Sequence, residues 1–201
     1  MTAPPSTPQP STPQPSTPQP STPQPGAPPA AVLIGPPGAG KTVVGALVAA
    51  SLGVEFRDTD EEVGAVAGKP VGEIFIDDGE EAFRALERQA AAGALGEHGP
   101  LREHGGVLAL GSGAVLDGGI QRLLDGLPVV YLSADFGTIA RRMGLDAPRV
   151  VIPGNPRGRL RAMLEERRQI YERLASVTVQ TDEKDPEELA EEITAMIGTA
   201  R

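Results

Sequence analysis

The stretch AVLIGPPGAGKTVVGAL, residues 31–47, decides the fold of this chain. Its first four residues are apolar and predict a short buried strand, and the valine- and alanine-rich run that starts at Lys41 predicts a helix to about Ser51. Between them, residues 35–42 match the pattern G-x-x-x-x-G-K-[S/T], in which backbone N–H groups and a helix N-terminus face a phosphate. A strand, this turn and a helix, in that order, indicate that the chain binds a nucleoside triphosphate, and we expect ATP.

The same loop carries the side chains that a triphosphate needs. Lys41 supplies a positive charge to the β- and γ-phosphates, and the hydroxyl of Thr42 is suited to ligate magnesium. The alternative is a glycine-rich turn that matches the pattern by chance, which the flanking strand and helix disfavour. The expected contacts of the loop with ATP are Gly38, Ala39, Gly40, Lys41, Thr42 and Val43.

Apolar strand segments and amphipathic helices alternate along the rest of the chain. We expect further strands at 54–56, 107–110, 128–132 and 177–180. We expect further helices at 60–67, 71–76, 80–95, 119–124, 136–143, 159–174 and 186–197, with loops at 96–106 and 144–158. Because strands that alternate with helices form parallel sheets covered on both faces, this pattern predicts a three-layer α/β/α fold.

The first 30 residues have a different composition. The pentapeptide STPQP occurs four times between Ser6 and Pro25, and residues 1–30 hold 12 of the 21 prolines and no charged residue. With no large apolar side chain to bury, this segment is expected to be a disordered, proline-rich tail. The folded domain then spans residues 31–201. A spacer or a ligand for a proline-binding domain is the functional alternative to a tail without a specific partner.

The overall composition excludes several classes of protein. The absence of cysteine excludes a disulfide scaffold and a thiolate metal site, and the net charge of −9 disfavours a general nucleic-acid binder. No apolar run approaches the ~20 residues that cross a membrane, and the N-terminus lacks the basic start and apolar stretch of a secretory signal. We therefore expect a cytoplasmic monomer with neither nucleic acid nor membrane as partner.

Two carboxylates follow the expected strand at 54–56. Asp58 and Asp60 should lie at the carboxyl end of the parallel sheet, the edge at which ligands of such folds bind. There Asp58 can hold magnesium through water, and Asp60 can accept a hydrogen bond from a substrate hydroxyl. An aspartate at this point is equally suited to cap the next helix, and the residues alone leave both interpretations open.

Several motifs, taken in order, resemble those of the shikimate kinase family. They are GPPGAGKT, FRDTD, GEEAFRALE, LGSGAV, an arginine-containing lid at about 144–158, ERRQIY and VQTD, and the similarity covers residues 31–197. The resemblance implies a nucleoside-monophosphate-kinase-like fold with a five-stranded parallel sheet. It also implies a magnesium-dependent transfer of the γ-phosphoryl group of ATP to the 3-hydroxyl of shikimate, a step of aromatic amino acid biosynthesis.

The resemblance assigns roles on the substrate side of the site. Asp60 is similar to the carboxylate that binds the acceptor hydroxyls and can act as the base. Arg84 and Arg167 are similar to the pair that clamps the substrate carboxylate, and Glu87 to the residue that orients Arg84. The substrate-contacting wall falls on Gly111, Ser112 and Gly113.

The resemblance also assigns roles on the nucleotide side. Thr42 and Asp58 would hold magnesium, and Arg149 in the lid would join Lys41 in stabilising the transferring phosphoryl group. Arg142 would pack on adenine, and Lys184 would border the base. For each of the four arginines on the two sides of the site, the alternative is a solvated surface charge.

The chain departs from the family pattern at two places. The wall is normally three glycines, but its middle residue here is Ser112; in the lid, Val150 follows Arg149 where the family usually has proline. Two rival functions are a kinase for another small hydroxylated compound, such as gluconate, and a nucleotide-binding regulator that has lost catalysis. The intact phosphate loop and aspartate pair disfavour the second rival, and the LGSGAV segment and paired arginines favour shikimate over the first.

Overall fold

The computed structural model describes residues 31–145 and 155–199. The expected tail at 1–30 and most of the expected lid, including Arg149 and Val150, lie outside these ranges.

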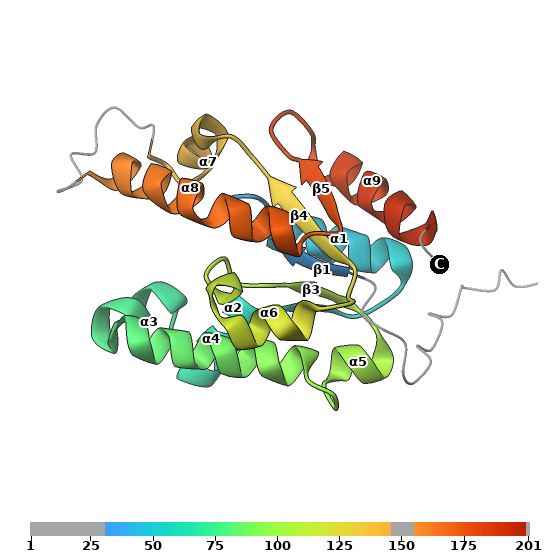
Figure 1. Ribbon diagram of the computed structural model, residues 1–201, viewed down its shortest axis with the longest axis horizontal. Helices are drawn as coiled ribbons and strands as arrows, with labels where there is room; N and C mark the ends of the chain where they lie inside the picture. Colours follow the sequence, from blue (N-terminus) through green and yellow to red (C-terminus); the bar gives the residue numbers. More distant parts are fainter. Residues whose placement is uncertain (1–30, 146–154, 200–201) are drawn as a thin grey trace, which may run out of the picture.

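The described residues form one parallel sheet with helices on both faces (Figure 1). The strand order is β2–β3–β1–β4–β5, so β1 lies in the middle and pairs with β3 and β4. This confirms the three-layer α/β fold with a five-stranded parallel sheet. The strands are β1 (Ala31–Ile34), β2 (Phe56–Asp58), β3 (Val107–Ala109), β4 (Val129–Ser133) and β5 (Val177–Gln180).

The alternation of side chains along β1 creates two separate cores. Ala31 and Leu33 face one side of the sheet, and Val32 and Ile34 face the other; all four are fully buried. On the first side pack α1 (Lys41–Leu52), α7 (Phe136–Arg142) and α9 (Pro186–Thr199). On the second pack α4 (Gly79–Leu95), α5 (Pro100–His104), the 3₁₀ turn η1 (Ala114–Leu116) and α6 (Gly118–Leu124).

The remaining helices build the rim around the carboxyl ends of the strands. Helix α8 (Pro156–Leu174) gives Leu160 to the first core and Tyr171 to the second. Helices α2 (Thr59–Ala67) and α3 (Val71–Asp77) pack with the start of α4 through a small cluster of their own, Val63, Ile74 and Phe83.

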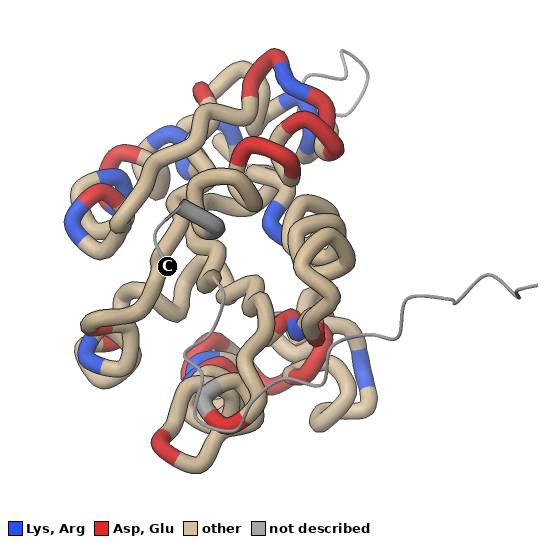
Figure 2. Tube along the Cα trace, turned by 90° about the vertical axis from the view of Figure 1, so that its right-hand side faces the viewer, with Lys and Arg blue, Asp and Glu red and all other residues tan. Residues whose placement is uncertain are grey.

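Charged residues lie mainly on the outer helices and loops (Figure 2). Within the five strands of the described ranges, the only charged residues are Arg57 and Asp58, both in the edge strand β2. None of the helices in the described ranges combines the length and the apolar character that a membrane span requires.

The expected second strand was wrong by two residues. Gly53 takes a left-handed conformation (φ 65°) and Val54 donates its N–H to the carbonyl of Ala49, so these residues close α1 instead of extending the sheet. Pairing begins at Phe56, which lies opposite Val107. The pattern of apolar residues could not predict this boundary, because the backbone N–H of an apolar residue can form the last hydrogen bond of a helix as readily as a hydrogen bond in a sheet.

Two expected loops are partly helical. Within 96–106, Pro100 opens the short helix α5 and the fully buried Leu101 anchors it. Within 144–158, α8 begins at Pro156, three residues earlier than predicted, because the side chain of Asn155 accepts the N–H of Gly158 at 2.9 Å. In both cases proline stands at the first helical turn.

Candidate active site

The phosphate loop, the aspartate pair and the wall open onto one cavity of about 340 Å³ at the carboxyl ends of the strands. Its lining residues are Pro37, Gly38, Gly40, Lys41, Thr42, Val43, Asp58, Asp60 and Ser112. The fold therefore brings together residues that the sequence separates by more than 70 positions.

The loop has the backbone shape that phosphate binding needs. Gly38 and Gly40 have φ values of 76° and 95°, a backbone conformation that residues with a side chain rarely adopt. Lys41 donates from Nζ to the carbonyl oxygens of Gly35 at 3.0 Å and Pro36 at 3.2 Å, so the ammonium lies across the loop. Burial lowers the pKa of Lys41, while the nearby carboxylates of Asp60 and Asp58 oppose this effect. The result is a positive charge positioned by backbone oxygens beside the cavity.

Asp58 caps the next helix, one of the two roles that the sequence left open, and it also contacts Thr42. Its Oδ1 accepts the N–H of Asp60 at 2.9 Å and caps α2, while its Oδ2 accepts the hydroxyl of Thr42 at 2.6 Å. The carboxylate is buried, and its hydrogen bonds with Thr42 and with the N-terminus of α2 replace those that it would make with water.

The same two residues fit a magnesium ion. Thr42 and Asp58 place a hydroxyl oxygen and a carboxylate oxygen side by side next to the phosphate loop. Mg²⁺ in kinases is commonly held by one or two such groups together with substrate phosphates and water. Within residues 31–145 and 155–199, no group of three or more His, Cys, Asp or Glu side chains could hold a metal ion without further ligands.

Asp60 lies between the loop and the wall. It lines the cavity with Lys41, and a methyl group added to Gly111 would come within 2.7 Å of its Oδ1. Although part of the Asp60 side chain is exposed, lost solvation raises the pKa of its carboxyl, and the charge of Lys41 opposes the rise. The backbone N–H of Gly111 donates to Thr59 at 2.8 Å, which fixes the wall against α2.

Arg84 is held at the wall from three sides. Its guanidinium donates to Glu87 at 2.7 Å, and Glu87 is only 2% exposed. The group also lies over the rings of Phe83, at 5.3 Å, and Phe75, at 5.8 Å. The pairing with Glu87 that the resemblance implied is therefore present. Gly113 leaves the space for this arrangement, since a side chain there would overlap the guanidinium.

Arg167 reaches the other side of the wall from α8. It donates from NH1 to the carbonyl of Ser112 at 3.2 Å, and its Nε is buried with no hydrogen-bond partner among the described residues. A buried, unpaired guanidinium N–H is unfavourable unless a ligand satisfies it, and an anion is the natural partner. Arg84, Arg167 and the wall thus lie together at one end of the site.

Sequence reasoning missed Tyr171, which shares this carbonyl. Its hydroxyl donates to Ser112 at 2.7 Å, and the side chain is 1% exposed. The signal was available, because the tyrosine follows Arg167 by four residues in ERRQIY and therefore shares its helix face. The partner on the wall was not readable from the sequence.

Of the three residues expected on the nucleotide side outside the loop, only Arg142 contacts the phosphate loop in the described structure. Arg142 bridges the phosphate loop and the turn after β5, donating to the carbonyl of Gly38 at 3.1 Å and to that of Thr181 at 2.6 Å. Its packing on adenine stays a prediction. Lys184 forms an ion pair with Glu192 and is partly exposed. The position of Arg149 lies outside the described residues.

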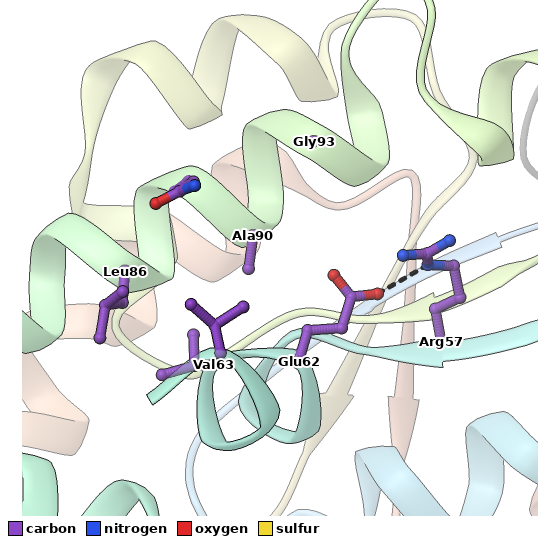
Figure 3. Close-up of a pocket in the computed structure, with 8 residues that line it drawn as sticks. Arg57, Glu62, Val63, Leu86, Ala90 and Gly93 are labelled. Atoms are coloured by element: carbon purple, nitrogen blue, oxygen red, sulfur yellow. Dashed lines mark hydrogen bonds and ion pairs between the residues drawn. The ribbon is translucent and has the colours of Figure 1, made fainter. Parts of the chain in front are cut away.

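A second hollow of about 240 Å³ lies between α2 and α4 (Figure 3). Its walls are mainly apolar, and Arg57 and Glu62 point toward one another in an ion pair of 2.6 Å at one side. It shares no lining residue with the cavity at the phosphate loop. The candidate active site is therefore the cavity at the loop.

Comparisons with known proteins point the same way. The family model described as "Shikimate kinase" matches residues 37–198. The chain is 53% identical over 163 residues to a shikimate kinase of Thermobifida fusca (81% of this chain, 91% of that protein). It is 51% identical over 169 residues to one of Salinispora arenicola (84% and 98%). Among solved structures, shikimate kinase from Acinetobacter baumannii in complex with shikimate superposes with a TM-score of 0.74 at 30% identity (90% and 96%).

Proposed function

This chain belongs to the shikimate kinase family, and we propose from that membership how its residues carry out the family's reaction. The protein is an ATP-dependent phosphotransferase that transfers the γ-phosphoryl group of ATP to the 3-hydroxyl of shikimate, giving shikimate 3-phosphate and ADP. The observation that carries the proposal is the order of groups in the site: a triphosphate loop at one end, two arginines at the other, and Asp60 between them.

The arginines select and orient the acceptor. Arg84 and Arg167 hold the carboxylate of shikimate, and Glu87 with the two phenylalanine rings keeps Arg84 in position before the substrate arrives. Holding the acceptor at a fixed distance from the phosphate loop lowers the entropic part of the barrier. The unpaired Nε of Arg167 supports an anionic group at this end.

Asp60 acts on the reacting hydroxyl. Its carboxylate accepts the hydrogen bond of the 3-hydroxyl and takes the proton as the oxygen attacks the γ-phosphorus. Lost solvation raises the pKa of the carboxyl and so makes it a stronger base, while the charge of the adjacent Lys41 opposes the rise.

The phosphoryl group is stabilised by positive charge around it. Lys41 and the backbone N–H groups of the loop hold the β- and γ-phosphates, and Arg149 of the lid adds a second cation to the transferring group. Thr42 and Asp58 would hold magnesium, which would neutralise charge on the phosphates when it is bound with ATP. The remaining ATP contacts that we propose are Arg142 on adenine and Lys184 beside the base.

The proposal also covers the oligomeric state, the location and the partners of the protein. We expect a monomer that works in the cytoplasm and binds neither nucleic acid nor membrane. The net charge of −9 supports the absence of a nucleic-acid partner, because a polyanion would be repelled.

Replacing Asp60 by asparagine tests the proposal. Asparagine keeps the size of the side chain but cannot accept a proton, so kcat should fall by about 10²–10⁴-fold. The dissociation constant for ATP should change little, because the role proposed for Asp60 is on the acceptor hydroxyl and not on the triphosphate. Steady-state kinetics and a nucleotide titration measure the two quantities.

Glu61→Gln is the matched control, since Glu61 is an exposed neighbour on the same helix and loses the same charge. Its kcat should equal that of the wild type. Near-normal turnover of Asp60→Asn would remove Asp60 from the mechanism.

A further inference from the structure

We propose that Tyr171 is a positioning residue for the acceptor's carboxylate: it holds the carbonyl of Ser112 so that Arg167 can leave that carbonyl and bind the substrate. The inference rests on the proposed function, because it concerns how one of the two carboxylate-binding arginines becomes available.

The first observation is that one carbonyl oxygen has two donors. The oxygen of Ser112 accepts the hydroxyl of Tyr171 at 2.7 Å and NH1 of Arg167 at 3.2 Å. The tyrosine makes the shorter of the two bonds. Burial raises the pKa of Tyr171 to about 12, so its hydroxyl remains protonated and donates at any physiological pH.

The second observation is that the unpaired Nε of Arg167 is buried. The guanidinium therefore has to turn, and NH1 has to leave the carbonyl of Ser112, before Nε can meet a substrate carboxylate. A partly buried carbonyl that loses its only donor is disfavoured, and this penalty would oppose a movement of Arg167 toward a carboxylate. With Tyr171 in place the carbonyl keeps a hydrogen bond when Arg167 turns away. Because Tyr171 and Arg167 share this acceptor, Arg167 can move to a substrate carboxylate without leaving the carbonyl of Ser112 unpaired.

The third observation is that Tyr171 is itself rigid. Its ring stacks on that of Tyr131 in β4, with centroids 5.1 Å apart and planes at 21°. The hydroxyl is thus fixed relative to the sheet, and Arg167 lies one helical turn away on the same helix.

Fixing the Ser112 carbonyl also fixes the next amide. Because the peptide unit is planar and trans, the N–H of Gly113 points opposite to the carbonyl that Tyr171 holds. Tyr171 thereby has two effects at the wall. It allows Arg167 to leave the carbonyl of Ser112, and it fixes the direction of the N–H of Gly113.

The variant Tyr171→Phe tests the inference with little change in packing. Phenylalanine keeps the stacked ring and removes only the hydroxyl, which leaves Arg167 as the sole donor of the two to Ser112. The KM for shikimate should rise about tenfold, in line with the loss of one partly buried hydrogen bond, while kcat and the KM for ATP stay within about twofold.

Tyr131→Phe is the matched control. It removes a hydroxyl from the other ring of the same stacked pair, and among the described residues that hydroxyl has no hydrogen bond to the wall. Its KM for shikimate should match that of the wild type. Melting curves of both variants set an assay temperature at which each is folded.

The methyl ester of shikimate separates positioning from general damage to the site. The ester carries no negative charge for Arg167, so the wild type and Tyr171→Phe should use it with equal kcat/KM. The inference would be overturned by an unchanged KM for shikimate in Tyr171→Phe, by an equal effect of Tyr131→Phe, or by a penalty that persists with the ester. A wild type that fails to phosphorylate shikimate would instead overturn the proposed function and the inference with it.

Discussion

Glycine is needed at position 113 because a larger residue would not fit beside Arg84, and not because of its backbone conformation. Its φ of −94° is open to any residue, yet a β-carbon there would overlap the guanidinium of Arg84. Gly111 is similar, with Glu87 and Asp60 within 2.7 Å of an added β-carbon. Ser112 lies between them, turns its carbonyl to α8 and lines the cavity.

The variant Gly113→Ala should therefore act on the acceptor alone. The methyl group displaces Arg84 from Glu87, and we expect the KM for shikimate to rise by more than about tenfold, as for loss of a charge-assisted hydrogen bond. The KM for ATP should be unchanged. Gly72→Ala adds a methyl group where nothing lies within 4 Å, so it should behave as the wild type. Equal kinetics for both variants would show that Arg84 has room to move.

Single residues differ in how far the sequence predicts them. The phosphate loop was readable because its function depends on local backbone shape, which a short pattern encodes. The contact between Tyr171 and Ser112 was not, because 59 positions separate the two and only the packed fold brings them together. The same holds for Thr59 and Gly111, which are 52 positions apart.

At the scale of elements, α1 packs closely on the sheet because of Gly45. An added β-carbon at this position would lie 2.6 Å from the ring of Phe56 and 3.0 Å from Leu33. Gly93 in α4 is the opposite case, since it is exposed and nothing lies within 4 Å. Two glycines inside helices thus have different structural reasons, which the sequence pattern alone does not distinguish.

Alanine at these two positions should shift stability in opposite directions. Gly93→Ala should stabilise the protein by about 0.5–1 kcal/mol through reduced backbone entropy of the unfolded chain. Gly45→Ala should destabilise it by about 1–3 kcal/mol through overpacking. Thermal or urea unfolding measures both, and a stabilised Gly45→Ala would contradict the packing described between α1 and β2.

Element types were predicted better than element ends. The strands and long helices follow from periodicity, whereas the ends depend on single hydrogen bonds, such as that from Val54 to Ala49 or from Gly158 to Asn155. These bonds decide where a helix stops or starts, and they have no periodic signature.

At the scale of the whole molecule, the described structure begins with the buried central strand β1. Ala31 is fully buried at the start of β1, and every described site residue follows it. That residues 1–30 form a separate tail stays a prediction. Alternating strands and helices sufficed for the layers of the fold, because each strand of a parallel sheet needs a crossover to the next.

Removal of residues 1–28 should leave catalysis and stability nearly unchanged. The sheet, both cores and the cavity at the phosphate loop lie entirely within the remaining chain. Turnover with shikimate and the melting temperature of the truncated and full-length proteins provide the comparison. A fall in turnover of more than a few-fold would show that the tail packs on the domain or controls the site.

The central claim is that this site phosphorylates a carboxylate-bearing acceptor, shikimate. Its most direct test offers the purified protein ATP and magnesium with shikimate, quinate, gluconate or a nucleoside monophosphate, and measures ADP release and kcat/KM for each acceptor. We predict the highest kcat/KM for shikimate, with shikimate 3-phosphate as the product. A higher value for gluconate or for a nucleoside monophosphate, or ADP release that is independent of the acceptor, would contradict the account.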